Sequence, residues 1–130
     1  MSDDPAFLTI EHVMAIHTRM MAEFGGEPSI RDSGLLEAAV MMPMAQFDGA
    51  LLHEGIHEMA AAYLFHICKN HAFADGNKRT ALTSAEVFIR LNGGSLTATD
   101  DELERLTRSV AEGGLSKDEV TAFFREKVDV

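Results

Sequence analysis

The chain of 130 residues is 46% hydrophobic and 25% charged, a composition that fits one globular domain and excludes a disordered chain. Its formal net charge of -10, from 21 acidic and 11 basic residues, opposes contact with a DNA backbone or an anionic membrane. The single cysteine, Cys68, excludes an internal disulfide. No apolar run approaches the ~20 residues of a membrane span, and the acidic N-terminus is unlike a secretory signal, so we expect a cytoplasmic protein.

The first half of the chain predicts two helices and a flap. Apolar residues recur at helical spacing over residues 10–24, and Gly25-Gly26 ends this helix. Asp32 is a good N-cap for a second helix, which Pro43 ends. Residues 44–52 predict a loop or a short extended flap. The buried stripe predicted for the first helix consists of Ile10, Val13, Met14, Met20, Met21 and Phe24.

The second half of the chain predicts four more helices. Helical spacing continues over residues 56–67 and from Lys78 to Leu91, with a Gly- and Asn-containing loop between them. Thr99 and Ser116 each begin a capping box, the second opening a final helix through Val128. Because no segment has a strong strand pattern, we expect an all-α fold of about six helices in a single domain, residues 1–130.

The start of the helix at Lys78 has the features of an anion site. The first turn of a helix carries backbone N–H groups without partners and the positive end of the helix dipole. Gly76 allows a close backbone approach, and Asn77 can adopt an unusual φ or donate from its amide. Lys78 and Arg79 are unfavourable for the helix itself at its positive end, which suggests that they serve a ligand such as a phosphate.

The loop before this helix adds an acid and a base. Asp75 is a single carboxylate beside the anion site, a common arrangement for Mg²⁺ bound together with phosphate oxygens. His71 can serve as a general base near neutral pH. Together these residues indicate phosphoryl or nucleotidyl transfer to a hydroxyl group.

The same segment resembles the motif of the Fic/Doc family, His-x-Phe-x-(Asp/Glu)-Gly-Asn-(Gly/Lys)-Arg. The fixed positions are matched by His71, Phe73, Asp75, Gly76, Asn77, Lys78 and Arg79. The short helical chain with lysine in the motif resembles the death-on-curing (Doc) branch, the toxins of bacterial toxin–antitoxin pairs. The resemblance implies the Fic-type helical bundle, with ATP and Mg²⁺ as cofactors. The implied roles are His71 as base, Asp75 on Mg²⁺, Gly76 and Asn77 in the anion hole, Lys78 and Arg79 on nucleotide phosphates, and Phe73 as a buried anchor.

Two positions bear on which group is transferred. Fic proteins that transfer AMP usually carry glycine where this chain has Lys78, and a second arginine where it has Leu82, which we expect to face the core. A lysine side chain fills the cradle and adds a point charge, which changes which phosphate fits. We therefore favour transfer of phosphate from ATP to a protein Thr/Ser hydroxyl over AMP transfer, the alternative. By resemblance the target is a threonine of translation elongation factor Tu, and the outcome is arrested translation.

The resemblance also implies a separate antitoxin. Many Fic proteins carry an inhibitory Ser/Thr-x-x-x-Glu-Gly/Asn helix of their own. The nearest match runs from Ser33 to Glu37, but Ala38 follows where Gly or Asn is expected. We therefore expect control by a partner protein that docks a segment folding on binding.

Two other functions compete with this interpretation. His53, Glu54 and His57 match the H-E-x-x-H pattern of zinc metalloproteases, although Gly55 would weaken the helix that this pattern requires. A helical binding module without catalytic activity is the other alternative.

The remaining titratable residues predict structural roles. His12, His17 and His66 lie in helical stretches without partners at a clear spacing, so we expect surface or core positions rather than ligands. Cys68 and Tyr63 are expected to be structural, with Cys68 a small buried residue rather than a nucleophile.

Overall fold

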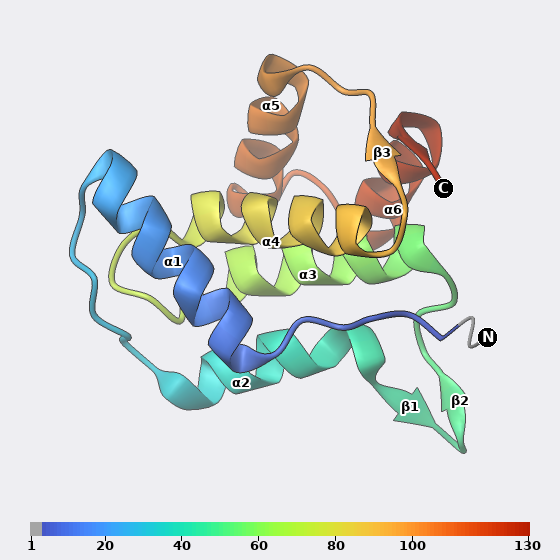
Figure 1. The fold of residues 1–130 in the computed structure, drawn as a ribbon, viewed down its shortest axis with the longest axis horizontal. Helices are drawn as coiled ribbons and strands as arrows, with labels where there is room; N and C mark the ends of the chain where they lie inside the picture. Colours follow the sequence, from blue (N-terminus) through green and yellow to red (C-terminus); the bar gives the residue numbers. More distant parts are fainter. Residues whose placement is uncertain (1–3) are drawn as a thin grey trace.

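Six α-helices form the fold of residues 4–130, the part of the chain that this computed structural model describes (Figure 1). The helices are α1 (Ile10–Phe24), α2 (Ser33–Met41), α3 (Ile56–Asn70), α4 (Asn77–Leu91), α5 (Asp100–Ala111) and α6 (Lys117–Lys127). Helix α3 lies in the centre and packs against α2, α4, α5 and α6. Its fully buried run Ala60–Ala62 lets these neighbours approach closely. The predicted all-α class is confirmed, and no helix of the described residues is long and apolar enough to cross a membrane.

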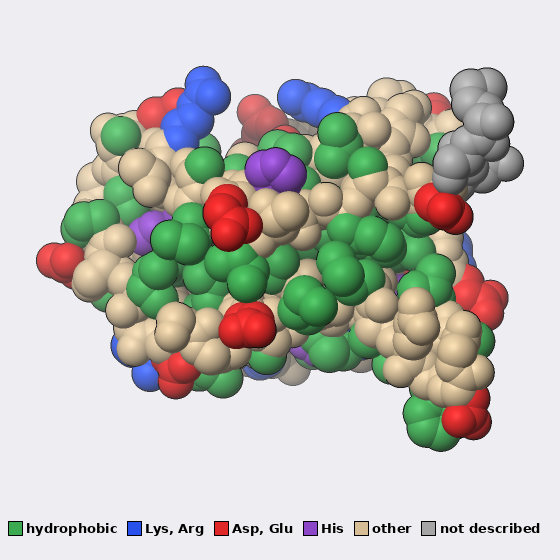
Figure 2. Space-filling model, turned by 60° about the horizontal axis from the view of Figure 1, so that its bottom comes forward, with side chains coloured by type: hydrophobic (Ala, Val, Ile, Leu, Met, Phe, Trp, Pro, Cys, Tyr) green, Lys and Arg blue, Asp and Glu red, His purple; other side chains and the backbone are tan. Residues whose placement is uncertain are grey.

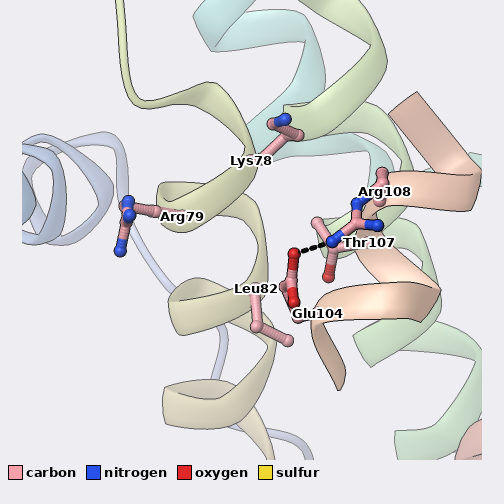
Figure 3. A pocket seen from close by; sticks show the side chains of 6 residues that line it. All are labelled: Lys78, Arg79, Leu82, Glu104, Thr107 and Arg108. Atoms are coloured by element: carbon pink, nitrogen blue, oxygen red, sulfur yellow. Dashed lines mark hydrogen bonds and ion pairs between the residues drawn. The ribbon is translucent and has the colours of Figure 1, made fainter. Parts of the chain in front are cut away.

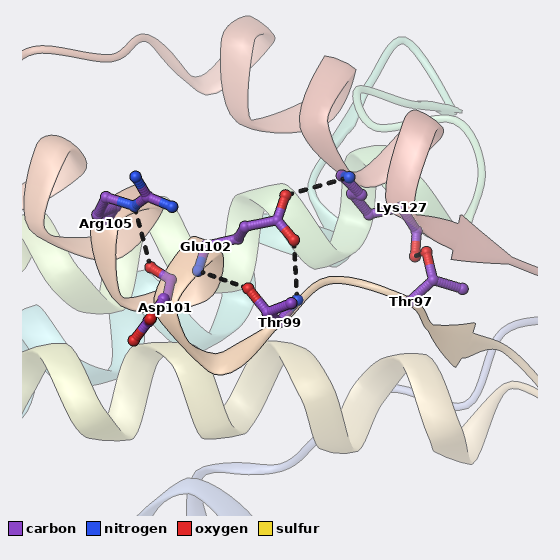
Figure 4. Close-up of polar contacts among 6 residues, drawn as sticks. All are labelled: Thr97, Thr99, Asp101, Glu102, Arg105 and Lys127. Carbon is purple, nitrogen blue, oxygen red and sulfur yellow. Dashed lines mark hydrogen bonds and ion pairs between the residues drawn. The ribbon is translucent and has the colours of Figure 1, made fainter.

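Side chains cap the helices where the sequence predicts it. The Asp32 carboxylate accepts the N–H of Leu35 at the start of α2. Thr99 and Ser116 open α5 and α6 with reciprocal capping boxes; Figure 4 shows the first of these. Helix α1 has a capping box that the sequence pattern did not predict, in which His12 takes the position usually held by Glu or Gln. Each cap pairs backbone N–H groups that would otherwise have no partner.

The buried stripe of α1 is narrower than predicted. Val13, Met20 and Met21 are buried, but Met14 is 39% exposed and Phe24 is 55% exposed. Instead of entering the core, the Phe24 ring lies under the Arg79 guanidinium, whose carbon is 3.8 Å from the ring centroid. The prediction was wrong at these two positions because apolar spacing marks one side of a helix without giving the width that the neighbouring elements cover.

The predicted flap is a short β-hairpin. After α2, the 3-10 helix η1 (Met42–Met44) leads into β1 (Gln46–Phe47), which pairs antiparallel with β2 (Ala50–Leu51). Asp48 and Gly49 join the strands with φ values of 52° and 80°, and positive φ at both positions is the requirement of a tight hairpin turn. The hairpin projects from the helices in Figure 1, and its Phe47 is 69% exposed.

The C-terminal end of the chain is tied to the connection between α4 and α5. Strand β3 (Ser95–Leu96) pairs antiparallel with β4 (Val128–Asp129). The prediction that the last helix includes Val128 was wrong: α6 ends at Lys127, and Val128 is buried through strand pairing. The Lys127 ammonium is 3.1 Å from a Glu102 carboxylate oxygen at the start of α5. Figure 4 shows this ion pair.

Candidate active site

The loop that carries the motif turns the chain back between the two central helices. His71 ends α3 with φ 50° and ψ 46°, and Gly76 precedes α4 with φ 81° and ψ 14°. Both residues are left-handed, a conformation that glycine adopts freely and histidine tolerates better than most residues. A Cβ atom on Gly76 would overlap the Cε atom of Met21 on α1. Glycine is therefore favoured at position 76 for two reasons: the positive φ, and the lack of room for a Cβ atom beside Met21.

The segment that joins α1 to α2 supports the loop along its backbone. The Ala74 N–H donates to the Ser29 carbonyl at 3.0 Å, and the Arg31 N–H donates to the Ala72 carbonyl at 2.7 Å. The Arg31 guanidinium donates to the His71 carbonyl, with its Nε at 2.8 Å. These bonds join segments about 40 residues apart and fix the backbone that carries His71.

Phe73 and Asn77 shape the loop from inside. Phe73 is 1% exposed, in agreement with its predicted role as an anchor. The Asn77 Oδ1 accepts the Phe73 N–H at 3.0 Å, and the Asn77 Nδ2 donates to the Phe73 carbonyl at 2.9 Å. Asn77 itself is the first residue of α4 and has helical geometry, not the unusual φ considered from the sequence. Its side chain is thus occupied by the loop, and its backbone N–H is what it offers to an anion.

The start of α4 has neither a capping side chain nor an acidic residue to cover its positive end. Helix α3, which follows Gly55, also has no side-chain cap, but it carries Glu58 in its first turn. Helices α1, α2, α5 and α6 are capped by side chains, whereas Gly76 provides no side-chain cap and the first turn of α4 contains no acidic residue. Two exposed cations, Lys78 and Arg79, stand in that turn. Unpaired N–H groups, the positive dipole end and two cations all favour an anion at this position.

A pocket of about 270 Å³ lies between this helix start and α5 (Figure 3). It is lined by Lys78, Arg79, Leu82, Glu104, Thr107 and Arg108. In Figure 3 the Lys78 and Arg79 side chains diverge, and that of Arg79 points toward α1. Across the pocket, Arg108 pairs with Glu104 one turn earlier on α5. Leu82, expected to face the core, is only half-buried and forms part of the pocket wall, because the space between α4 and α5 stays open beside it.

Asp75, the expected Mg²⁺ ligand, has one of its two carboxylate oxygens bonded to the backbone. Its side chain is exposed, and one oxygen, Oδ2, accepts the Glu27 N–H at 2.8 Å. Residues 4–130 contain no group of three or more His, Cys, Asp or Glu side chains arranged to hold a metal ion. A metal ion bound to Asp75 would therefore need most of its ligands from a bound molecule or from water. Mg²⁺ meets this condition because it takes one or two carboxylates and completes its shell with phosphate oxygens and water.

Known proteins place this loop in a family. Residues 7–89 match the Fic/DOC family. The chain belongs to this family. It is 42% identical over 101 residues to a protein named Toxin Doc from Mycolicibacterium smegmatis, covering 76% of this chain and 78% of that one. It is 34% identical over 115 residues to a protein named Protein kinase doc from Escherichia phage P1, covering 88% and 90% of the two chains.

The competing zinc pattern does not have the geometry of a zinc helix in this Fic/DOC protein. Helix α3 begins only at Ile56, after Gly55 with φ 94°, so His53 and Glu54 precede it. His57 lies in the first turn of α3, and its Nε2 is 3.2 Å from the Val128 carbonyl oxygen. The two histidines therefore do not share one face of a helix, which the protease pattern requires.

Two residues away from the Fic/DOC motif have the structural roles that the sequence predicts. Tyr63 is fully buried, its hydroxyl oxygen accepts the Leu8 N–H at 2.8 Å, and burial raises its pKa to about 12. Cys68 is also fully buried, and burial raises the pKa of its thiol. A buried thiol of this kind is a poor nucleophile.

One residue near the motif loop was given no specific role by the sequence. His17, on α1, is 2% exposed and lies on the side of the Fic/DOC loop that faces α1. Its Nε2 is 2.8 Å from the Asp75 carbonyl oxygen. Nothing in the local spacing of α1 points to a residue 58 positions away. Only the burial of His17 agrees with the sequence pattern, which allowed a core position.

Proposed function

We propose that this chain is the toxin of a toxin–antitoxin pair and transfers the γ-phosphoryl group of ATP to a Thr or Ser hydroxyl of a protein. The observation that carries the proposal is the start of α4, which has no side-chain cap, bears two cations and adjoins a loop with one exposed carboxylate and an exposed histidine. This set of groups suits a magnesium nucleotide and an acceptor hydroxyl. The names of the two relatives, a toxin and a protein kinase, agree with it.

Each group in the loop has a separate task in this proposal. The nucleotide supplies the phosphoryl group, and its Mg²⁺ neutralises phosphate charge. Asp75 would hold that metal through the oxygen that Glu27 leaves free. The backbone N–H groups at the start of α4, with Lys78 and Arg79, would bind the phosphates. His71 would take the proton from the acceptor hydroxyl.

Lys78 and Leu82 favour phosphate over AMP as the transferred group. Relatives that transfer AMP usually have glycine and arginine at these positions. Here Lys78 fills part of the space beside the helix start, and Leu82 puts an apolar side chain on the pocket wall where a second cation would stand. Both changes alter which phosphate the site neutralises. The pocket beyond them is large enough to receive another part of the nucleotide. AMP transfer remains the alternative.

Labelled ATP tests the reaction. The protein is incubated with Mg²⁺ and a bacterial lysate, with ATP labelled at either the α- or the γ-phosphate. We expect protein labelling from the γ position only, abolished by His71→Ala. The matched control is His12→Gln, which replaces an exposed histidine by a residue that completes the capping box of α1 equally well. Labelling from the α position only would establish AMP transfer in place of the proposal.

We further propose that the acceptor is a threonine of cytoplasmic elongation factor Tu and that a separate antitoxin silences the enzyme. The chain presents exposed apolar side chains to such protein partners: Met14, Leu35, Met41, Phe47 and Leu52. In Figure 2, apolar side chains also cover the middle of one face while Lys and Arg lie near its edges. In the same assay, purified elongation factor Tu should become labelled from the γ-phosphate of ATP and not from the α-phosphate. Growth arrest that persists in His71→Ala would favour the binding-module alternative.

A further inference from the structure

His17 makes two contacts with the motif loop, both from a buried position. Its ring stacks on Phe73 with 3.7 Å between the ring centroids and 7° between the ring planes. Its Nε2 is 2.8 Å from the Asp75 carbonyl oxygen. Because a carbonyl oxygen can only accept, Nε2 must be the donor and carry the proton. The stack thus fixes the plane of the ring, and the bond fixes one peptide group of the loop.

The peptide held in this way joins Asp75 to Gly76. All peptide bonds of the described residues are trans, and in a trans peptide the C=O and the N–H point in opposite directions. Since the Asp75 carbonyl points toward His17 on α1, the Gly76 N–H points away from α1. Rotation of this peptide would turn that N–H away from its present direction.

Helix α1 supports the same peptide at a second point. Met21 lies one turn after His17, is also buried, and has its Cε atom where it would overlap a Cβ on Gly76. We call these two side chains the α1 platform: His17 contacts the Asp75 carbonyl oxygen, and Met21 lies beside the Gly76 α-carbon. The platform leaves little room for the loop to sink toward α1.

We infer that His17 is a positioning residue for the transfer reaction, holding the Asp75–Gly76 peptide so that the Gly76 N–H faces the phosphate being transferred. The inference rests on the proposed function. A fixed N–H donor aimed at developing charge is a strong catalytic contribution, and losing one costs about 100- to 1000-fold in kcat. His17 touches neither substrate nor nucleotide, so its effect passes entirely through the peptide.

Two substitutions separate the bond from the stack. His17→Phe keeps an aromatic ring against Phe73 and removes the donor. His17→Gln removes the ring and keeps an N–H at similar reach. We expect His17→Phe to lower kcat for γ-phosphoryl transfer by about tenfold or more, with little change in KM for the protein acceptor. His17→Gln should recover a substantial part of that loss. Equal impairment of both variants, or wild-type kcat in His17→Phe, would overturn the inference.

A second readout does not depend on activity. The backbone amide of Gly76 is followed by nuclear magnetic resonance while MgADP is added. We expect its resonance to shift in the wild type and in His17→Gln, and to respond much less in His17→Phe. An equal response in all three proteins would overturn the inference. If the wild type transfers no phosphate, the proposed function fails, while this experiment still decides the role of His17.

The wild-type protein alone offers a further check that needs no folded variant. The tautomer of His17 is read from the nitrogen shifts of its ring in protein labelled at histidine. We expect the proton on Nε2, as the bond to the Asp75 carbonyl requires. A proton found only on Nδ1 would overturn the inference.

Discussion

Asn77 holds both backbone groups of Phe73, accepting its N–H at 3.0 Å and donating to its carbonyl at 2.9 Å. The pair joins the first residue of α4 to the middle of the motif loop, four positions earlier. Because Phe73 is also fixed in the core, the loop is closed between two rigid points. The position of the proposed phosphate site relative to His71 therefore depends on this pair.

Replacing Asn77 tests that dependence. Asn77→Ala removes two hydrogen bonds and leaves the Phe73 N–H without its partner, so we expect the free energy of unfolding to fall by about 1–3 kcal/mol. Asn77→Asp keeps the acceptor and places a negative charge at a helix start, so its stability should lie closer to the wild type. Urea unfolding measures both values.

The two Asn77 variants should also differ in ligand binding. Asn77→Asp adds a negative charge at the helix start beside the proposed phosphate site, so MgADP should bind this variant more weakly despite its smaller loss of stability. Titration calorimetry measures the affinity. Unchanged stability in Asn77→Ala, or unchanged MgADP binding in Asn77→Asp, would contradict the assigned role of this pair.

Gly76 and Met21 should be energetically coupled. Gly76→Ala incurs the cost of a positive φ, about 1–2 kcal/mol, and an overlap with the Met21 side chain worth about 1–3 kcal/mol more. Gly49→Ala is the matched control, because Gly49 has nearly the same φ, 80° against 81°, and a methyl group added there would have no atom within 4 Å. We expect Gly76→Ala to destabilise the protein more than Gly49→Ala.

A double-mutant cycle isolates the contact. Met21→Ala should relieve the overlap, so the double variant Met21→Ala, Gly76→Ala should lose less stability than the sum of its two single variants. The free energies of unfolding of all four proteins are compared in urea. Simple additivity would show that Met21 moves aside freely and does not form a platform.

His66 should make stability depend on pH. Burial, followed by the charge of Lys117, lowers its pKa from 6.5 to about 4, and its Nε2 lies 3.1 Å from the Lys117 Nζ. The unfolded chain thus binds this proton more strongly, so the free energy of unfolding decreases as the pH falls from 6.5 toward about 4. His66→Gln should reduce this decrease, because glutamine can still accept from Lys117 and does not titrate.

Unfolding in urea over this pH range provides the comparison. The same two causes lower the pKa of His53, so part of the decrease should remain in His66→Gln. Well above pH 6.5 the difference between wild type and variant should become constant, since His66 is then neutral in both the folded and the unfolded chain. Parallel curves across the whole range would contradict the lowered pKa of His66.

Zinc should not bind tightly at the H-E-x-x-H pattern. Only His57 of this pattern lies within α3, and its ring is engaged with the Val128 carbonyl. After dialysis against a chelator and then against zinc, we expect metal analysis to find well below one zinc per chain. Stoichiometric zinc that survives further dialysis would restore the protease alternative.

Local signals in the sequence predicted most of the helices and the motif loop. Capping residues such as Thr99 and Ser116 act within one turn, and the Asp48-Gly49 turn is complete in itself, so these features could be found without a structure. The bond between His17 and Asp75 joins residues 58 positions apart, and no local pattern contains it. The same holds for Val128, whose strand partner lies more than 30 residues earlier, at Leu96.

The most direct test of the proposed reaction is the mass of the modified acceptor. The lysate protein that becomes labelled is recovered after incubation with ATP and Mg²⁺, digested, and analysed by mass spectrometry, with His71→Ala as the parallel sample. We expect one Thr- or Ser-containing peptide to gain the mass of a phosphoryl group in the wild-type sample alone. A gain equal to AMP, or the same modification with His71→Ala, would contradict phosphoryl transfer by this loop.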